Sequence, residues 1–269
     1  MALKNTGNSY ALVTGGSSGI GWAFVRQLAS RGYNLCIVSN EKEKLPVLKE
    51  ELELEFKITC QTLYIDLAQK DAALNVYNFC KEQALTIQVL INNAGFLIAD
   101  KVIDVDPAKV NALLNLHVCT TTMMCRYFAK DMVDRGIGYI LNTSSTSAFM
   151  PYPTISLYGP SKTYIRNFTR ALRNELYSEN IHVSCVMPGA VDTSLYDISS
   201  GQVKLAKALG IMHSPEFIAK RGMWLLSRNI GSSIPGWMNK LTLVFLKFIP
   251  DFVIRWVLGI RDRKVEGKM

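Results

Sequence analysis

Apolar residues occur along the chain in two alternating patterns. Short apolar runs alternate with longer segments in which apolar residues return at helical spacing. The short runs predict strands at Tyr10–Val13, Leu35–Ser39, Lys57–Ile65, Gln88–Asn92, Gly138–Asn142 and His182–Met187, with a weaker seventh at Ser232–Ile234. Helical spacing is found for Ile20, Phe24, Val25 and Leu28, for Leu45, Leu48 and Leu52, and within Pro107–Met132 and Ile155–Tyr177. Strands that alternate with helices predict βαβ units and therefore a parallel sheet.

The length and composition fit one α/β domain. The chain has 269 residues, of which 49% are hydrophobic and 19% charged, enough for a large core and unlike disordered chains. We expect residues 1–269 to form a single domain, a doubly wound, Rossmann-type parallel sheet of about seven strands with helices on both faces. In such sheets ligands bind beyond the carboxyl ends of the strands, so the residues after each strand are the functional candidates.

The cysteines, the histidines and the N-terminus argue against a disulfide-bonded, a metal-binding and a secreted protein. Six cysteines occur without a Cys-x-x-Cys pair, which predicts reduced, buried thiols at Cys36, Cys60, Cys80, Cys119, Cys125 and Cys185. The histidines show no metal-ligand spacing, so no metal is predicted, and His117 is interpreted as a packing or surface residue. The first nine residues lack the apolar run of a signal peptide, and we expect synthesis in the cytosol.

The formal net charge of +8 is compatible with nucleic acid, an anionic membrane, or an anionic cofactor and substrate. Half of this excess lies in residues 236–269, where seven Lys or Arg accompany three acids. Elsewhere basic and acidic residues are mixed, whereas a nucleic-acid binder needs a basic stripe with aromatic stacking groups. No nucleic-acid partner is therefore predicted.

A glycine-rich loop follows the first predicted strand and leads directly into a helix. Its sequence is Thr14-Gly15-Gly16-Ser17-Ser18-Gly19-Ile20-Gly21. Gly15 allows the tight turn, Gly19 lets the backbone approach a pyrophosphate, and Gly21 allows close helix packing. Backbone N–H groups at the start of the helix can bind anionic oxygens, and the two serine hydroxyls can donate as well. The loop predicts a dinucleotide phosphate site, and its Gly-x-x-x-Gly-x-Gly spacing resembles that of the short-chain dehydrogenase/reductase family.

Further motifs extend this resemblance over about two thirds of the chain, from Thr14 to Thr193. Asn92-Asn93-Ala94-Gly95 matches the family segment that stabilises the sheet and borders the cofactor, and Pro188–Thr193 matches the segment whose threonine contacts the nicotinamide carboxamide. Asp66 matches the acidic contact to adenine, although an Asp at such a place is more often a helix N-cap. The resemblance implies cofactor binding by Gly15, Ser17, Ser18, Gly19, Ile20, Gly21, Ser39, Asn40, Asp66, Leu67, Asn93, Ala94, Gly95, Tyr158, Lys162, Pro188, Gly189, Val191 and Thr193.

Ser145, Tyr158 and Lys162 match the catalytic residues of the same family. Tyr158 and Lys162 are four residues apart and so share one helix face, and Ser145 lies thirteen residues before Tyr158. A carbonyl that receives a hydride develops negative charge on oxygen, which a proton donor within hydrogen-bond reach relieves. Tyr158 is the predicted donor, and the Lys162 ammonium stabilises a phenolate, since tyrosine ordinarily has a pKa of ~10. The resemblance implies that Lys162 also bonds the nicotinamide ribose and that Ser145 holds the substrate oxygen.

The resemblance implies a fourth catalytic residue, Asn115, which would support a water relay, with Asn111 as a nearby competitor. One departure from the family pattern is Gly159-Pro160, where relatives usually carry small residues. Proline is tolerated in the first turn of a helix, so the match requires that this helix begin near Leu157.

Cofactor choice depends on the end of the second strand, where an acid accepts the ribose hydroxyls of NAD and an arginine pairs with the phosphate of NADP. This chain has Ser39-Asn40 at that place, with Lys42 and Lys44 close behind. The missing acid favours NADP(H), while NAD(H) stays open.

The family forms its substrate pocket from the loop after Thr193 and from the C-terminal segment. Residues 194–230 are therefore assigned to the substrate-loop region, whose apolar groups predict a hydrophobic ketone or alcohol: Leu195, Tyr196, Ile198, Met212, Phe217 and Trp224. The apolar and basic segment 236–269 is interrupted by Lys247, Pro250, Asp251 and Arg255, so it is not a spanning helix. It is expected either to pack on the core or in an oligomer interface, or to lie in a membrane surface or over a lipid-like substrate.

The sequence thus predicts an NAD(P)(H)-dependent oxidoreductase that interconverts a ketone and a secondary alcohol on an acyl-chain or steroid-like substrate. A looser resemblance is to the subgroup that reduces 3-oxoacyl chains and steroid ketones. The alternative is a regulatory protein that binds a dinucleotide without catalysis, against which the intact Ser145, Tyr158 and Lys162 argue. The resemblance implies a homodimer or homotetramer. We expect a cytoplasmic protein, with peripheral membrane contact through 236–269 left open.

Overall fold

Seven parallel strands form one sheet in the computed structural model, which describes residues 5, 7–150, 152–192, 212–246, 250 and 252. Their order across the sheet is β3-β2-β1-β4-β5-β6-β9. These strands are β1 (Tyr10–Thr14), β2 (Asn34–Ser39), β3 (Cys60–Tyr64), β4 (Ile87–Asn92), β5 (Gly138–Thr143), β6 (Ile181–Val186) and β9 (Ser232–Ser233). All neighbouring pairs are parallel, so the carboxyl ends of the strands meet at one edge. The predicted doubly wound sheet of about seven strands in a single domain is confirmed.

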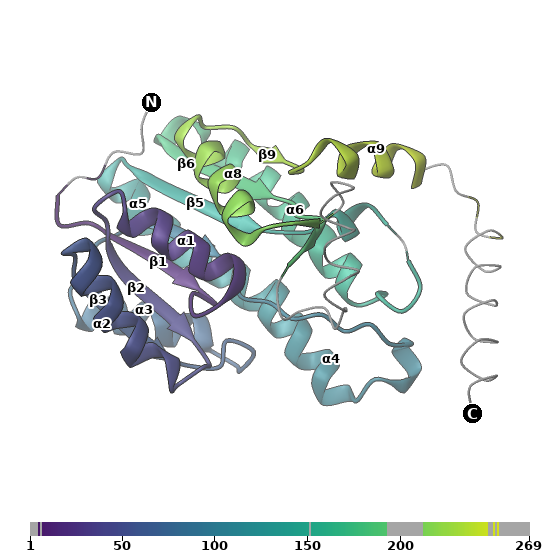
Figure 1. Cartoon of the computed structure of the whole chain (residues 1–269), viewed down its shortest axis with the longest axis horizontal. Helices are drawn as coiled ribbons and strands as arrows, with labels where there is room; N and C mark the ends of the chain where they lie inside the picture. Colours follow the sequence, from purple (N-terminus) through teal and green to yellow (C-terminus); the bar gives the residue numbers. More distant parts are fainter. Residues whose placement is uncertain are drawn as a thin grey trace.

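Helices cover both faces of this sheet. Those of the described residues are α1 (Gly19–Ala29), α2 (Lys44–Phe56), α3 (Ala72–Glu82), α4 (Pro107–Leu114), α5 (Thr121–Arg135), α6 (Tyr158–Glu175), α8 (Pro215–Ser227) and α9 (Trp237–Leu246). In Figure 1, α1 and α8 lie side by side on the near face, and α5 and α6 lie behind the sheet. The strand order reverses between β1 and β4, which is where ligands bind in sheets of this topology.

Alternating side chains of the strands divide the core into two layers. Ala11 and Val13 of β1 belong to the layer under α1, α2 and α8, while Tyr10 and Leu12 belong to the layer under α3 and α5. Period-two alternation is what a strand buried on both faces requires, because successive side chains point to opposite sides. The strands read as continuous apolar runs for this reason.

Most predicted elements differ from the structure by one to three residues at an end, and two of the differences have a local cause. The third strand begins at Cys60 rather than Lys57, because α2 continues to Phe56 and Lys57 ends it in the left-handed region with φ of 56°. The predicted helix Pro107–Met132 is interrupted by a π-helical turn at Asn115–Thr120. Within this turn the Thr121 hydroxyl donates to the Leu116 carbonyl five residues earlier, at 3.2 Å.

The region assigned to the substrate loop contains elements that the sequence did not predict. Ala190–Val191 (β7) and Met212–His213 (β8) pair as a small separate sheet. Helix α8 packs on the core, with Ile218 and Met223 buried, while Phe217 and Trp224 are partly exposed. Residues 193–211, which include Leu195, Tyr196 and Ile198, lie outside the described residues.

The described part of the C-terminal segment is mainly α9. Its Asn239 is buried and lies against Gly189, where an added Cβ would come within 2.6 Å of the amide nitrogen. At least this helix therefore packs on the core. No helix among the described residues has the length and apolar character needed to cross a membrane. The prediction of membrane contact falls mainly on residues outside the described ones.

The prediction that the six cysteines are buried thiols is wrong for one of them. Cys119 is exposed, whereas Cys36, Cys60, Cys80, Cys125 and Cys185 are buried. Cys119 lies in the π-helical turn, and a residue in a helical segment can face solvent even where its sequence neighbours are apolar.

Candidate active site

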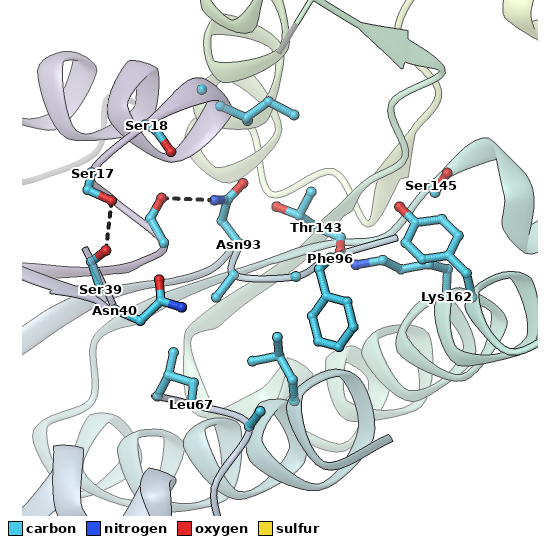
Figure 2. Close-up of a pocket in the computed structure, with 18 of the residues that line it drawn as sticks. Ser17, Ser18, Ser39, Asn40, Leu67, Asn93, Phe96, Thr143, Ser145 and Lys162 are labelled. Carbon is cyan, nitrogen blue, oxygen red and sulfur yellow. Dashed lines mark hydrogen bonds between the residues drawn. The ribbon is translucent and has the colours of Figure 1, made fainter. Parts of the chain in front are cut away.

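A cavity of about 590 Å³ opens at the carboxyl edge of the sheet, across the β1–β4 switch point. Figure 2 shows its two ends: Ser17, Ser39 and Asn40 lie at one end, and Ser145 and Lys162 at the other. Asn93 and Phe96 lie between them. The cavity therefore joins the glycine loop to the predicted catalytic residues.

The glycine loop is fixed by the segment that follows β4. Thr14 Oγ1 accepts hydrogen bonds from the backbone N–H groups of Asn93 and Ala94 at 2.9 and 3.0 Å, and the Asn93 amide donates to the Thr14 carbonyl at 3.3 Å. Gly15 has a φ of +62°, in the left-handed region that glycine adopts without strain. These contacts fix the glycine loop in front of the N-terminus of α1, where free backbone N–H groups can bind an anion.

Helix α6 positions the tyrosine and the lysine. It begins at Tyr158, so Gly159 and Pro160 fall in its first turn, as the sequence-based match required. The Ser144 hydroxyl donates to the Lys162 carbonyl at 2.7 Å and ties the helix to the end of β5. The Lys162 ammonium donates to the Thr143 carbonyl at 3.2 Å and lies 5.5 Å from the centre of the Tyr158 ring. This places a cation beside a phenol that faces the cavity.

Ser145 begins a 3-10 turn at Thr146–Phe149 at the end of β5. Its Oγ accepts a hydrogen bond from the Ser147 N–H at 3.1 Å. Because the oxygen acts as an acceptor in this contact, its own hydrogen remains available for another oxygen in the cavity.

Burial lowers the pKa of Lys162 from 10.5 to about 8, with a smaller opposing effect from the neighbouring Cys185. The side chain is only 4% exposed, so its charged form lacks hydration that it has in the unfolded chain. The charge on Lys162 is therefore costly for folding, and its retention points to a functional role.

Replacement of Lys162 by methionine should stabilise the ligand-free protein at pH 7. Below pH 8 the lysine is charged in both states and the full burial cost is present. Between pH 8 and 10.5 the unfolded chain binds a proton that the folded chain has released, so wild-type stability rises with pH. The gain in free energy of unfolding should be about 1–3 kcal/mol at pH 7, because the lost bond to Thr143 offsets part of it, and should shrink toward pH 10.5.

Urea unfolding at pH 7 and pH 10 measures this difference. The exposed Lys70 provides the matched control, and Lys70→Met should change stability by less than about 0.5 kcal/mol at either pH. A loss of stability in Lys162→Met at pH 7 would mean that the hydrogen bond to Thr143 outweighs desolvation.

An acid that the sequence analysis overlooked lies at the far end of the cavity. Glu41 lines the cavity, and its carboxylate accepts hydrogen bonds from the Ser17 hydroxyl and, at 2.5 Å, from the Lys44 ammonium. The Glu41 N–H donates to Ser39 Oγ at 3.1 Å, and the Ser39 and Ser17 hydroxyls are 2.7 Å apart. Lys44, followed by Ser17, holds the pKa of Glu41 below its usual range, so the carboxylate is charged.

Most of the predicted site residues line this cavity together. They are Gly15, Ser17, Ser18, Gly19, Ile20, Ser39, Asn40, Asp66, Leu67, Asn93, Ala94, Gly95, Ser145, Tyr158, Lys162, Pro188, Gly189 and Val191. Gly21 does not line it but supports it, because a Cβ there would lie 1.9 Å from the Gly15 carbonyl oxygen. Asn115 is half-buried in the π-helical turn and does not line the cavity, and Thr193 lies outside the described residues.

Asp66 does not cap α3, which begins at Ala72. Its carboxylate instead accepts from the Ala68 N–H at 2.9 Å, within the loop that lines the cavity. The cavity also includes residues that the sequence analysis did not name: Glu41, Ile65, Ala68, Phe96, Ala112, Leu116, Thr143 and Ser144. Of these residues only Glu41 could have been predicted from the sequence, because it is an acid two residues beyond the second strand, where the family carries its ribose-binding acid. Within the described residues, no group of three His, Cys, Asp or Glu side chains is placed to hold a metal ion.

Comparison with known proteins agrees with this arrangement. The family model for short chain dehydrogenases matches residues 9–202. A very-long-chain 3-oxoacyl-CoA reductase from Macaca fascicularis is 29% identical, over 89% of this chain and 83% of that protein. The inactive hydroxysteroid dehydrogenase-like protein 1 from Pongo abelii is 27% identical, over 95% of this chain and 77% of that protein. A solved 7beta-hydroxysteroid dehydrogenase structure has the same fold, with a TM-score of 0.85 at 24% identity, over 95% of this chain and 99% of that one.

The fold and the cavity together define a Rossmann-type α/β protein with a dinucleotide-sized site at the switch point of its sheet. Because the family match spans more than half of the sequence, the chain belongs to the short-chain dehydrogenase family, an oxidoreductase family that uses NAD(P)(H). Family membership alone does not establish turnover, since one of these relatives is named as inactive.

Proposed function

We propose that this protein transfers a hydride between a nicotinamide dinucleotide and the carbonyl or secondary alcohol carbon of a hydrophobic substrate, with Tyr158 as the acid and base. The observation that carries the proposal is that Ser145, Tyr158 and Lys162 line the same cavity as the glycine loop. One continuous cavity can hold the dinucleotide phosphates at the loop and the reacting carbon beside the phenol.

The residues of the cavity fit such a cofactor. Ser17, Ser18 and the N-terminus of α1 are suited to the pyrophosphate, and Asp66 and Leu67 to the adenine. The segment with Pro188, Gly189 and Val191 begins beside the catalytic end, because the Pro188 carbonyl accepts a hydrogen bond from the Thr146 N–H at 2.8 Å, and the nicotinamide would be held there. This end of the cavity stays open partly because Gly95 has no side chain. A Cβ at Gly95 would come within 3.3 Å of the Lys162 nitrogen. When bound, the nicotinamide supplies or accepts the hydride.

Ser145, Tyr158 and Lys162 each have a separate role in the proton transfer. Ser145 donates its free hydrogen to the substrate oxygen and so orients the carbonyl. Tyr158 gives its proton to that oxygen as negative charge develops, or takes the proton from an alcohol in the reverse direction. The Lys162 ammonium, 5.5 Å from the Tyr158 ring centre, stabilises the phenolate that remains. Asn115 is proposed to support this proton transfer through its helix backbone rather than through the cavity wall.

We propose a long-chain 3-oxoacyl thioester as the substrate, ahead of a steroid ketone. One relative is named as a very-long-chain 3-oxoacyl-CoA reductase and aligns over most of both chains. Phe96 and Leu116 add apolar surface to the cavity, which suits an aliphatic chain better than a polar substrate.

The test follows absorbance of NADH and NADPH with 3-oxoacyl-CoA esters of several chain lengths, steroid ketones and small ketones. We expect oxidation of the cofactor that increases with acyl chain length. Cofactor binding without oxidation of any panel member would favour a dinucleotide-binding regulator, and absence of binding would refute the proposal.

We further propose that Glu41 makes the enzyme prefer NAD(H). The preference for NADP(H) inferred from Ser39-Asn40 rests on a missing acid, whereas the Glu41 carboxylate lies beside Ser17 and Ser39 in the cavity. A carboxylate there can accept hydrogen bonds from ribose hydroxyls and repels a phosphate. Lys44 is engaged by Glu41, and the Lys42 ammonium lies over the Tyr64 ring, 5.8 Å from its centre.

Replacement of Glu41 by glutamine should raise kcat/KM for NADPH relative to NADH by about tenfold or more, because the charge facing the phosphate is removed while an acceptor is kept. Glu43→Gln is the control, since Glu43 is exposed on the adjacent turn and should leave the ratio unchanged. A wild-type preference for NADPH that Glu41→Gln does not alter would contradict this role and favour the preference inferred from the sequence.

A further inference from the structure

His117 is a buried, partly unpaired side chain at the base of the site. It is fully buried in the π-helical turn Asn115–Thr120, and in the described part of the chain its Nε2 has no hydrogen-bond partner. Its ring packs edge-on against Tyr158, with 5.7 Å between ring centres. Buried polar atoms are nearly always hydrogen-bonded, so an orphaned one beside reacting groups calls for a function. Short π-helical turns occur frequently at functional sites.

The hydrogen-bond network fixes the tautomer of this imidazole. The Ser161 hydroxyl donates to the Tyr158 carbonyl at 2.7 Å. Ser161 Oγ is also 2.8 Å from His117 Nδ1, and because its only hydrogen is used, Nδ1 must carry a hydrogen and donate. In a neutral imidazole Nε2 then bears a lone pair and acts as an acceptor.

That lone pair lies close to the lysine. A Cβ placed on Gly95 would be 2.8 Å from His117 Nε2 and 3.3 Å from Lys162 Nζ. The two nitrogens are therefore at most about 6 Å apart, and since Nε2 has no direct partner, one bridging water is the contact that this span allows. Gly95 leaves the space between them clear, because any side chain there would meet both atoms.

We propose that His117 is a positioning residue for Lys162, and that its unprotonated Nε2 accepts a hydrogen bond from a water molecule that the Lys162 ammonium in turn binds. The acceptor keeps the lysine charged and directed toward Tyr158, so it supports the phenolate without contacting the substrate. This role rests on the proposed function, in which Lys162 must be charged for Tyr158 to act.

The surrounding groups are consistent with a neutral acceptor. Burial, followed by the charge on Lys162, lowers the pKa of His117 well below its usual range. The other titratable groups facing Lys162 are Tyr158 on α6 and Cys185 on β6, and burial raises the pKa of the Cys185 thiol to about 12. On β5 the facing group is the uncharged Thr143 carbonyl, and the loop after β4 contributes Gly95, which has no side chain. No carboxylate among these groups can replace the acceptor.

The first measurement is made on the ligand-free wild-type protein and does not depend on turnover. Nitrogen-15 NMR of the imidazole should show a hydrogen on Nδ1 and none on Nε2 from pH 6 to 9. A hydrogen on Nε2 would overturn the proposal, because no lone pair would then face Lys162. Inactivity of the wild type would count against the proposed function and leave this result interpretable.

The second measurement follows the Lys162 titration by NMR of its Cε in wild type, His117→Gln and His117→Phe. Glutamine keeps an acceptor and phenylalanine keeps only the ring. We expect the pKa of Lys162 to fall by about one unit in His117→Phe and to stay near the wild-type value in His117→Gln. The basic limb of the pH profile of kcat for reduction should move by the same amount.

A purely structural role predicts a different pattern. Both variants would then have lower melting temperatures but unchanged Lys162 titrations and pH profiles, and that outcome would overturn the proposal. Ser161→Ala gives a further check that leaves the imidazole in place. It frees Nδ1 from its acceptor, so a mixed tautomer and a smaller shift of the Lys162 pKa in the same direction are expected.

Discussion

Tyr158→Phe should lower kcat for carbonyl reduction by at least about a hundredfold and up to about ten-thousandfold, the range that a general acid contributes. Phenylalanine keeps the ring that packs against His117 but lacks the proton that the developing alkoxide needs. The Kd of the dinucleotide should change by less than about threefold, because the glycine loop and its clamp by Asn93 are untouched. Single-turnover absorbance of the cofactor measures the first quantity and fluorescence titration the second.

The matched control is Tyr164→Phe, one and a half turns further along the same helix. Tyr164 is partly exposed and its hydroxyl bonds Thr122 on the surface, so the variant should keep wild-type kcat. Activity of Tyr158→Phe within about tenfold of wild type would assign the proton to another donor, for which Ser145, a hydroxyl that lines the same cavity, is the candidate. A wild type that binds the dinucleotide but never oxidises it would instead place this protein with its inactive relative.

The fold was predictable because the strands are buried on both faces. Ala11 and Val13 face one layer and Tyr10 and Leu12 the other, so β1 reads as an unbroken apolar run, and the same holds along β2 and β4. The sequence-based prediction was wrong at two places with weaker patterns. The third strand was predicted to begin at Lys57, which instead ends α2 in the left-handed region, and α8 was not predicted as a helix. The apolar residues of α8 were interpreted as a substrate loop, because a helix that packs on a distant α1 leaves no local signature.

Most of the cavity lining was predictable at both ends, whereas Glu41 and the orientation of His117 were not, for a physical reason. Ser145, Tyr158 and Lys162 stand at fixed intervals on one strand end and one helix, so their spacing carries their geometry. Glu41 lies in the cavity wall, where Ser17, from a different loop, donates a hydrogen bond to its carboxylate. His117 was interpreted as packing, and only the contact between two separate helical segments shows that Ser161 orients it. Such contacts join residues far apart in sequence, which local patterns do not encode.

Gly21→Ala should weaken dinucleotide binding by about a hundredfold or more and lower the melting temperature. An alanine Cβ at this position would lie 1.9 Å from the Gly15 carbonyl oxygen and 2.8 Å from the Asn93 amide nitrogen. The first is a backbone atom in the loop itself, so the clash can be relieved only by moving the loop away from α1. That movement breaks the contact between Asn93 and the loop and misdirects the N–H groups that hold the pyrophosphate.

Gly16→Ala is the control within the same loop. Its Cβ would meet the Ile37 and Val25 methyl groups at 2.9 and 3.1 Å and the Val13 carbonyl oxygen of β1 at 3.2 Å, and the two methyl groups can shift by a few tenths of an ångström. We expect the Kd of the dinucleotide to stay within about threefold of wild type in this variant, because the loop backbone need not move. Circular dichroism of both variants separates loss of binding from loss of fold. If folded Gly21→Ala binds NADH as tightly as wild type, the proposed placement of the pyrophosphate at the glycine loop is wrong.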